Sequence, residues 1–129
     1  MRLYYLDTSA LLKRYKSESG SDNICDLFAH CESPPKRLIT SLFTIVELIS
    51  VSDRFAKQKM VSKTLRRELL RTFAADAEEY LHFISMDDGI VLSAADFVSK
   101  YSLRSGDALH LASLQRTNES ISGYELDVA

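Results

Sequence analysis

The chain has 129 residues, of which 46% are apolar and 26% are charged, and its formal net charge is −2. These values are typical of one compact domain that needs neither disulfides nor a structural metal to fold. No apolar run approaches the ~20 residues that span a bilayer, and the apolar N-terminal run is too short for a secretory signal. We therefore expect a single domain over residues 1–129, located in the cytoplasm and away from membranes.

The apolar pattern alternates short strands with longer helices. Strands are predicted at residues 2–6, 37–40, 82–85 and 119–122. Helices are predicted at residues 7–16, 20–31, 41–57, 61–80, 88–101 and 107–116. This order predicts a three-layer α/β/α sandwich around a parallel sheet of about four to five strands. In such sheets, ligands bind at the carboxyl ends of the strands.

The first acidic residue of interest, Asp7, directly follows the apolar run Tyr4-Tyr5-Leu6 at the carboxyl end of the first predicted strand. This position makes it a candidate ligand for a cation. The alternative is a purely local role, because aspartate is also a favoured N-cap of a following helix.

Glu47 is the only charged residue in the apolar stretch 42–51. A carboxylate among such residues is expected to be at least half buried, and an unpaired buried charge is costly. Glu47 therefore needs a partner, which is either a bound cation or a structural lysine or arginine.

Asp107 begins the last predicted helix, where the helix dipole would favour an acid even without a function. His110 follows three residues later, on the same helical face. We interpret His110 as a partly buried, hydrogen-bonded histidine rather than a ligand.

The three acids have a common explanation. Mg²⁺ and Mn²⁺ prefer carboxylate oxygens and keep several waters, so three or four acids around a cleft are enough to bind one ion. Such an ion polarises a phosphoryl oxygen and lowers the pKa of a bound water. The sequence therefore predicts a metal site formed by Asp7, Glu47 and Asp107.

A basic segment lies at residues 54–71, where seven lysines and arginines face one glutamate, a local charge of 7 − 1 = +6. Such a segment can contact phosphates while an acidic site lies elsewhere on the domain. The alternative is an ordinary solvated helix surface. The candidate nucleic-acid-binding residues are Arg54, Lys57, Lys63, Arg66 and Arg67.

Three segments, in this order, resemble the motifs of PIN domains, and in particular those of the VapC branch. They are LDTSAL at residues 6–11, TSLFTIVEL at residues 40–48 and LRSGDALHLA at residues 103–112. The resemblance implies Mg²⁺- or Mn²⁺-dependent hydrolysis of RNA, with Asp7, Glu47 and Asp107 as metal ligands. It also implies that Thr8 or Ser9 helps to hold Asp7 and the metal-bound waters.

For the VapC branch, the resemblance further implies an RNA-cutting toxin that an antitoxin neutralises by inserting into the groove, commonly with toxin dimers. The metal would activate a water to attack the phosphorus in line, and the products would carry a 5′-phosphate and a 3′-hydroxyl.

The sequence departs from the family at the fourth acid. Ser122 fits the hydroxyl position of the expected element, but Tyr124 stands where an aspartate is usual, and Glu125 or Asp127 would have to replace it. The chain also ends where the family usually continues, which predicts a truncated C-terminal edge.

This departure motivates an alternative hypothesis, a catalytically weak PIN-like module that binds RNA or a protein partner. An aspartate-nucleophile phosphotransferase would fit Asp7, but it needs a second aspartate where Ser9 stands.

Overall fold

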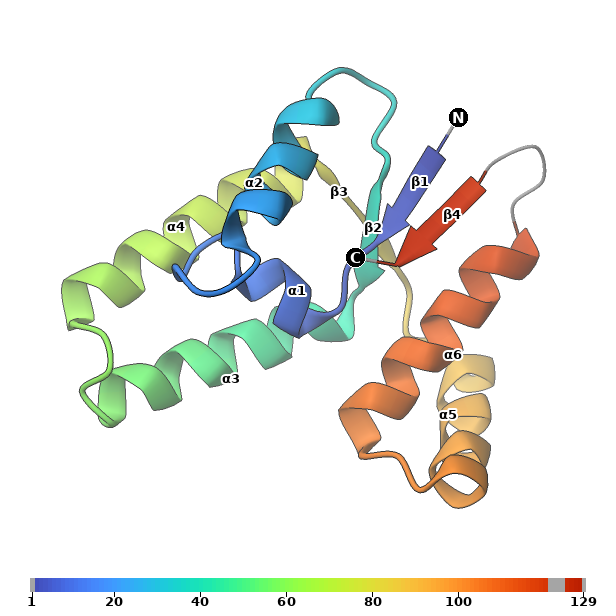
Figure 1. Ribbon diagram of the computed structural model, residues 1–129. Helices are drawn as coiled ribbons and strands as arrows, with labels where there is room; N and C mark the ends of the chain where they lie inside the picture. The colour runs from blue at the N-terminus through green and yellow to red at the C-terminus, as the bar shows by residue number, and fades with distance from the viewer. Residues whose placement is uncertain (1, 121–124, 129) are drawn as a thin grey trace.

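The computed structural model describes residues 2–120 and 125–128, and its centre is a parallel sheet (Figure 1). The strands are β1 (Arg2–Tyr5), β2 (Leu38–Ser41), β3 (Leu81–Ile84) and β4 (Glu125–Val128). Their order across the sheet is β3-β2-β1-β4, and each neighbouring pair is parallel. The carboxyl ends of all described strands therefore lie at one edge.

The helices form a layer on each side of this sheet (Figure 1). One layer contains α1 (Thr8–Leu12), α2 (Ser21–His30), α3 (Phe43–Lys57) and α4 (Lys63–Glu79). The other contains α5 (Asp88–Tyr101) and α6 (Ser105–Ser120). The predicted three-layer α/β/α sandwich is confirmed.

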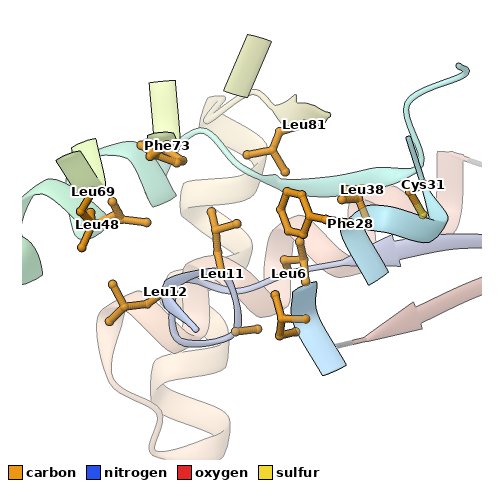
Figure 2. Close-up of a cluster of buried hydrophobic side chains, with 12 residues drawn as sticks. Leu6, Leu11, Leu12, Phe28, Cys31, Leu38, Leu48, Leu69, Phe73 and Leu81 are labelled. Carbon is orange, nitrogen blue, oxygen red and sulfur yellow. The ribbon is translucent and has the colours of Figure 1, made fainter. Parts of the chain in front are cut away.

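The core lies on both faces of the sheet because the side chains of a strand alternate between them. On one face, Leu6 and Leu38 pack with Leu11 and Phe28 from the α1–α4 layer (Figure 2). On the opposite face, Tyr5 packs in a cluster with residues of β2, β3, β4 and α6. Tyr5 therefore points away from the main core and toward the helix that carries Asp107 and His110.

The C-terminal part of the chain differs from the sequence-based prediction. The strand predicted at residues 119–122 is wrong at its start, because α6 continues through Ser120 and β4 follows at Glu125–Val128. Within this longer helix, Thr117 and Ser120 each donate a hydrogen bond to the backbone carbonyl four residues earlier, so both hydroxyls are satisfied inside the helix. Residues 121 and 122 lie outside the described part of the chain.

The first helix is shorter than predicted. It ends at Leu12 rather than near residue 16, because Lys13 and Tyr15 each donate to a carbonyl only three residues back, a tighter turn than an α-helix. None of the helices over residues 2–120 is both long enough and apolar enough to cross a membrane.

Candidate active site

Asp7 lies at the carboxyl edge of the sheet, directly between β1 and α1. It is the N-cap of α1, and its Oδ1 accepts a hydrogen bond from the backbone N–H of Ala10 at 2.8 Å. The capping role that the sequence left open is therefore present. This bond uses one carboxylate oxygen, so capping is compatible with a second role for the side chain.

Glu47 lies in the second turn of α3 and is half-buried. Its Oε1 accepts hydrogen bonds from Thr8 Oγ1 at 2.6 Å and from His110 Nε2 at 2.7 Å. Its Oε2 faces Gly106, where an added Cβ would come within 2.7 Å. A side chain at position 106 would therefore displace the Glu47 carboxylate from its present place.

His110 connects this carboxylate to β1. Besides its contact with Glu47, His110 places Nδ1 2.9 Å from the hydroxyl of Tyr5 and Nε2 3.1 Å from Thr8 Oγ1. A carboxylate only accepts, so Nε2–H of His110 donates to Glu47. The histidine is buried and hydrogen-bonded, as the sequence suggested.

Tyr5 is a member of this network that the sequence analysis did not identify. Burial raises the pKa of its phenol well above the ordinary value, and the nearby carboxylates of Asp7 and Glu47 raise it further. The raised pKa keeps the phenol protonated at neutral pH, so Tyr5 is a hydrogen-bond donor there. The available signal was a buried tyrosine two residues before Asp7, since a buried phenol normally requires a partner.

Asp107 lies exposed in the first turn of α6, directly after the glycine that contacts Glu47. Asp7 is likewise adjacent to Thr8, which donates to Glu47. Both outer acids are therefore chain neighbours of residues that contact the central one. This places all three predicted acids around the carboxyl edge of the sheet.

The acids gather in one region, but they do not form a completed ion cage. Over residues 2–120 and 125–128, no three histidine, cysteine, aspartate or glutamate side chains lie close enough together to hold one ion. The chemistry of the donors fits a hard divalent cation, because carboxylates and a hydroxyl are oxygen ligands. Binding one ion between the three acids would therefore require them to come closer together than they lie here.

The 18 acids divide into five that form ion pairs with arginine or lysine and thirteen that form none in the described part of the chain. The five paired acids are Asp53, Asp76, Asp87, Glu125 and Asp127. In the described part of the chain, Asp7, Glu47 and Asp107 have no such partner, and the only cationic candidate near Glu47 is His110. A structural lysine or arginine partner for Glu47, the alternative that the sequence left open, is therefore not found there.

The two candidates for the fourth acid lie on β4 and are paired with Arg2. The register places Glu125 beside Arg2 and Asp127 beside Tyr4, so both precede the level of Asp7. Asp127 nevertheless lines the same groove of about 680 Å³ as Asp7 and the exposed Ser9. Ser122 and Tyr124 lie outside the described residues.

The predicted nucleic-acid-binding residues fall into two neighbouring hollows. Lys57, Lys63, Arg66 and Arg67 line a pocket of about 440 Å³ between the end of α3 and the start of α4. Arg54 lines a smaller hollow of about 190 Å³ on α3, and Glu47 lines it too. Helix α3 thus connects the acidic edge to the basic end of the domain.

The layered fold, with its acids at the carboxyl edge of a parallel sheet, defines the class of α/β proteins that bind ligands at that edge. The PIN domain family model matches residues 4–121, and the chain belongs to this family. PIN domains are generally nucleases and generally use divalent metal ions. Comparison with curated proteins gave no match.

Proposed function

We propose that this chain is a divalent-metal-dependent endoribonuclease of the VapC type, the toxin of a toxin–antitoxin pair acting in the cytoplasm. The observation that carries the proposal is the set of three acids without lysine or arginine partners around one edge of the sheet, in the part of the chain that the structure describes. Acids without an internal cation are available to an external one, and what sets these three apart from the other unpaired acids is their shared place at the carboxyl edge.

Asp7, Glu47 and Asp107 would hold the Mg²⁺ or Mn²⁺ ion. When bound, the ion would supply charge stabilisation at the phosphoryl oxygens and a more acidic water. Thr8 and His110 both donate to Oε1 of Glu47 and so orient its carboxylate, leaving Oε2 turned toward the start of α6. Hydrolysis would break the bond between phosphorus and the 3′-oxygen, leaving a 5′-phosphate and a 3′-hydroxyl.

Asp7→Asn is the most informative variant for testing cleavage. Asparagine caps a helix as well as aspartate does, so this substitution removes the charge while it keeps the observed bond to Ala10. We expect the wild-type protein to cleave RNA with Mn²⁺ or Mg²⁺, and we expect a chelator to abolish this cleavage. The Asp7→Asn variant should be inactive under both conditions. Asp96→Asn, at an exposed position on α5, is the matched control and should cleave normally.

A second test uses linkage between metal binding and folding. Mn²⁺ should raise the melting temperature of the wild-type protein, because it binds the folded acids preferentially. In Asp7→Asn this rise should shrink, while the metal-free melting temperature should increase through relief of repulsion between the acids. A metal-free melting temperature that falls instead would assign Asp7 to the fold alone.

The alternative, a catalytically weak PIN-like module that binds RNA or a protein, is favoured by one observation. No three metal-binding side chains converge in the described residues, and Glu47 already accepts two hydrogen bonds. RNA binding by a wild-type protein that cleaves no RNA with either metal would decide for this alternative.

The proposal includes a homodimer and an antitoxin, supported by apolar side chains left exposed on two helices. Val46 and Ile49 on α3 are 62% and 42% exposed, and Leu92 on α5 is 68% exposed. Exposed apolar patches of this kind mark protein-binding surfaces. We expect Val46→Glu to shift the protein from dimer to monomer in light scattering, and an unchanged mass would remove α3 from the interface.

A further inference from the structure

The basic pocket, formed by Lys57, Lys63, Arg66 and Arg67, lies at the end of the molecule where α3 turns into α4. Asp53 is the only acid among its lining residues, so the lining carries a net charge of 4 − 1 = +3. Four cations around one concave surface repel one another unless an anion enters.

The single acid neutralises only part of this charge. Asp53 lies 3.0 Å from the Lys57 ammonium and 4.0 Å from the Arg66 guanidinium. Lys63 and Arg67 form no ion pair with any residue in the described ranges. Two cations of the pocket are thus left for a ligand.

Arg66 provides a second, independent observation. Its Nε is buried and has no hydrogen-bond partner among the described residues. A buried guanidinium N–H without an acceptor is costly, and an anionic oxygen in the pocket would supply the missing acceptor.

The residue types favour a phosphate group. A guanidinium offers a planar fork of donors that matches phosphate oxygens, and lysine ammonium groups add point charges around the same anion. The first turn of α4 carries no acid, so the positive end of the helix dipole adds to this field.

The basic pocket lies at a defined distance from the predicted metal ligands along α3. Lys57 lies ten residues after Glu47 on α3, which is about 15 Å along the helix axis. Arg54 lies about 10 Å from Glu47 on the same helical face and lines a hollow together with it. Positive charge therefore continues from the acidic edge to the pocket.

We propose that the basic pocket binds a backbone phosphate of the RNA strand, a few nucleotides away from the bond that is cut at the acidic edge. This inference rests on the proposed ribonuclease function. The pocket acts as a remote anchor: only a strand long enough to span α3 occupies both places, so the pocket selects substrates by length.

The test measures RNA binding separately from cleavage. Lys63→Gln/Arg67→Gln is placed in the Asp7→Asn background, and its affinity for labelled oligoribonucleotides of increasing length is measured by fluorescence anisotropy with a chelator present. The matched control is Lys36→Gln/Lys100→Gln, which also removes two positive charges, at exposed positions outside both the pocket and the basic segment.

We expect the pocket variant to bind long strands about tenfold or more weakly. The slope of log affinity against log salt concentration should become shallower by about 0.7 for each of the two phosphate-binding charges removed. The shortest strands should bind both variants equally. The anchor would be overturned by an equal loss of RNA affinity in the control variant. It would also be overturned if the loss in the pocket variant were the same for strands of every length.

Inorganic phosphate distinguishes a free anion from the RNA backbone. If phosphate raises the melting temperature of the wild-type protein but not of the pocket variant, and both bind long RNA equally, the pocket takes a free anion and the RNA assignment is wrong. The anchor and the ribonuclease function can fail separately. If the wild-type protein cleaves RNA but the pocket variant binds RNA as well as its parent does, only the anchor is overturned. Weakened binding in the pocket variant, with no wild-type cleavage, overturns only the nuclease.

Discussion

Asp76 and Glu47 are two carboxylates in one domain that are satisfied in opposite ways. Asp76, on α4, is 4% exposed and accepts from the Arg14 guanidinium at 3.1 and 3.3 Å and from the Tyr15 hydroxyl at 2.8 Å. Glu47 accepts from a threonine hydroxyl and a histidine.

The surroundings of Asp76 show that its role is structural. The Arg14 guanidinium also lies 4.1 Å from the centre of the Phe28 ring. Burial raises the pKa of Tyr15, and the adjacent Asp76 raises it further, so this phenol stays a donor. The ion pair between Arg14 and Asp76 thus joins the segment after α1 to α4, and the two charges compensate each other.

Carboxylates thus have two different roles in this domain. A carboxylate compensated by an arginine of its own chain stabilises the fold, whereas one held by a hydroxyl and an imidazole N–H is oriented while its charge remains available. The Glu47 side chain is also the more exposed, at 26% against 5% for Asp76.

Asp76→Ala should lower the free energy of unfolding by about 3–5 kcal/mol, because it leaves the partly buried Arg14 without its counter-charge. Urea denaturation measures this, with Glu79→Ala at an exposed position on the same helix as the control. A loss below about 1 kcal/mol, the range of a surface pair, would contradict the structural assignment of Asp76.

Glu47→Gln should show the opposite profile. Glutamine keeps an oxygen that can accept from Thr8, but it removes the charge. RNA cleavage should therefore fall by at least about 100-fold, which exceeds the loss typical when a residue that only hydrogen-bonds to a metal ligand is replaced. Stability should change far less than in Asp76→Ala. If the variant cleaves normally but unfolds as easily as Asp76→Ala, the two carboxylates do not differ in role.

His110→Gln should weaken Mn²⁺ binding by about 10–100-fold, as expected when a group that orients a ligand is removed. Isothermal titration with Mn²⁺ measures this without reference to activity. His82→Gln, at an exposed position on β3, is the control and should bind Mn²⁺ as the wild-type protein does. Equal affinity in both variants would limit His110 to packing.

The smallest effect concerns Asp87, an exposed carboxylate that combines the two modes. It caps α5 through Ile90 N–H and pairs with Arg116, which lowers its pKa to about 2. Since the folded pKa lies below the ordinary value of about 3.9, the charged form stabilises the protein above that pH, and this stability is lost as the pH falls toward about 2.

Asp87→Asn should therefore melt slightly below the wild-type protein at neutral pH, and the difference should vanish near the lowest pH of this range. Melting temperatures of both proteins across the range measure this. A difference that grows as the pH falls would contradict the assigned direction of the pKa shift.

Local signals predicted much of the structure. The three-layer fold followed from strands alternating with helices, and the cap at Asp7 followed from an aspartate before an apolar helix. The start of β4 could not be predicted, because Thr117 and Ser120 are weak helix formers in sequence but lie inside α6, where their hydroxyls bond to the helix's own carbonyls.

The order of the elements could be predicted from the chain alone, as could the position of Asp7 and Glu47 beside apolar runs and the family resemblance. The groups that these acids contact depend on how the three layers pack. His110 is 63 residues from Glu47 and Tyr5 is 105 residues from His110, while Arg2 takes Glu125 and Asp127 at the far end of the chain. The physical reason is that caps and periodicity are set by neighbours a few residues away, whereas the compensation of a charge depends on which distant side chains the packed layers bring to it.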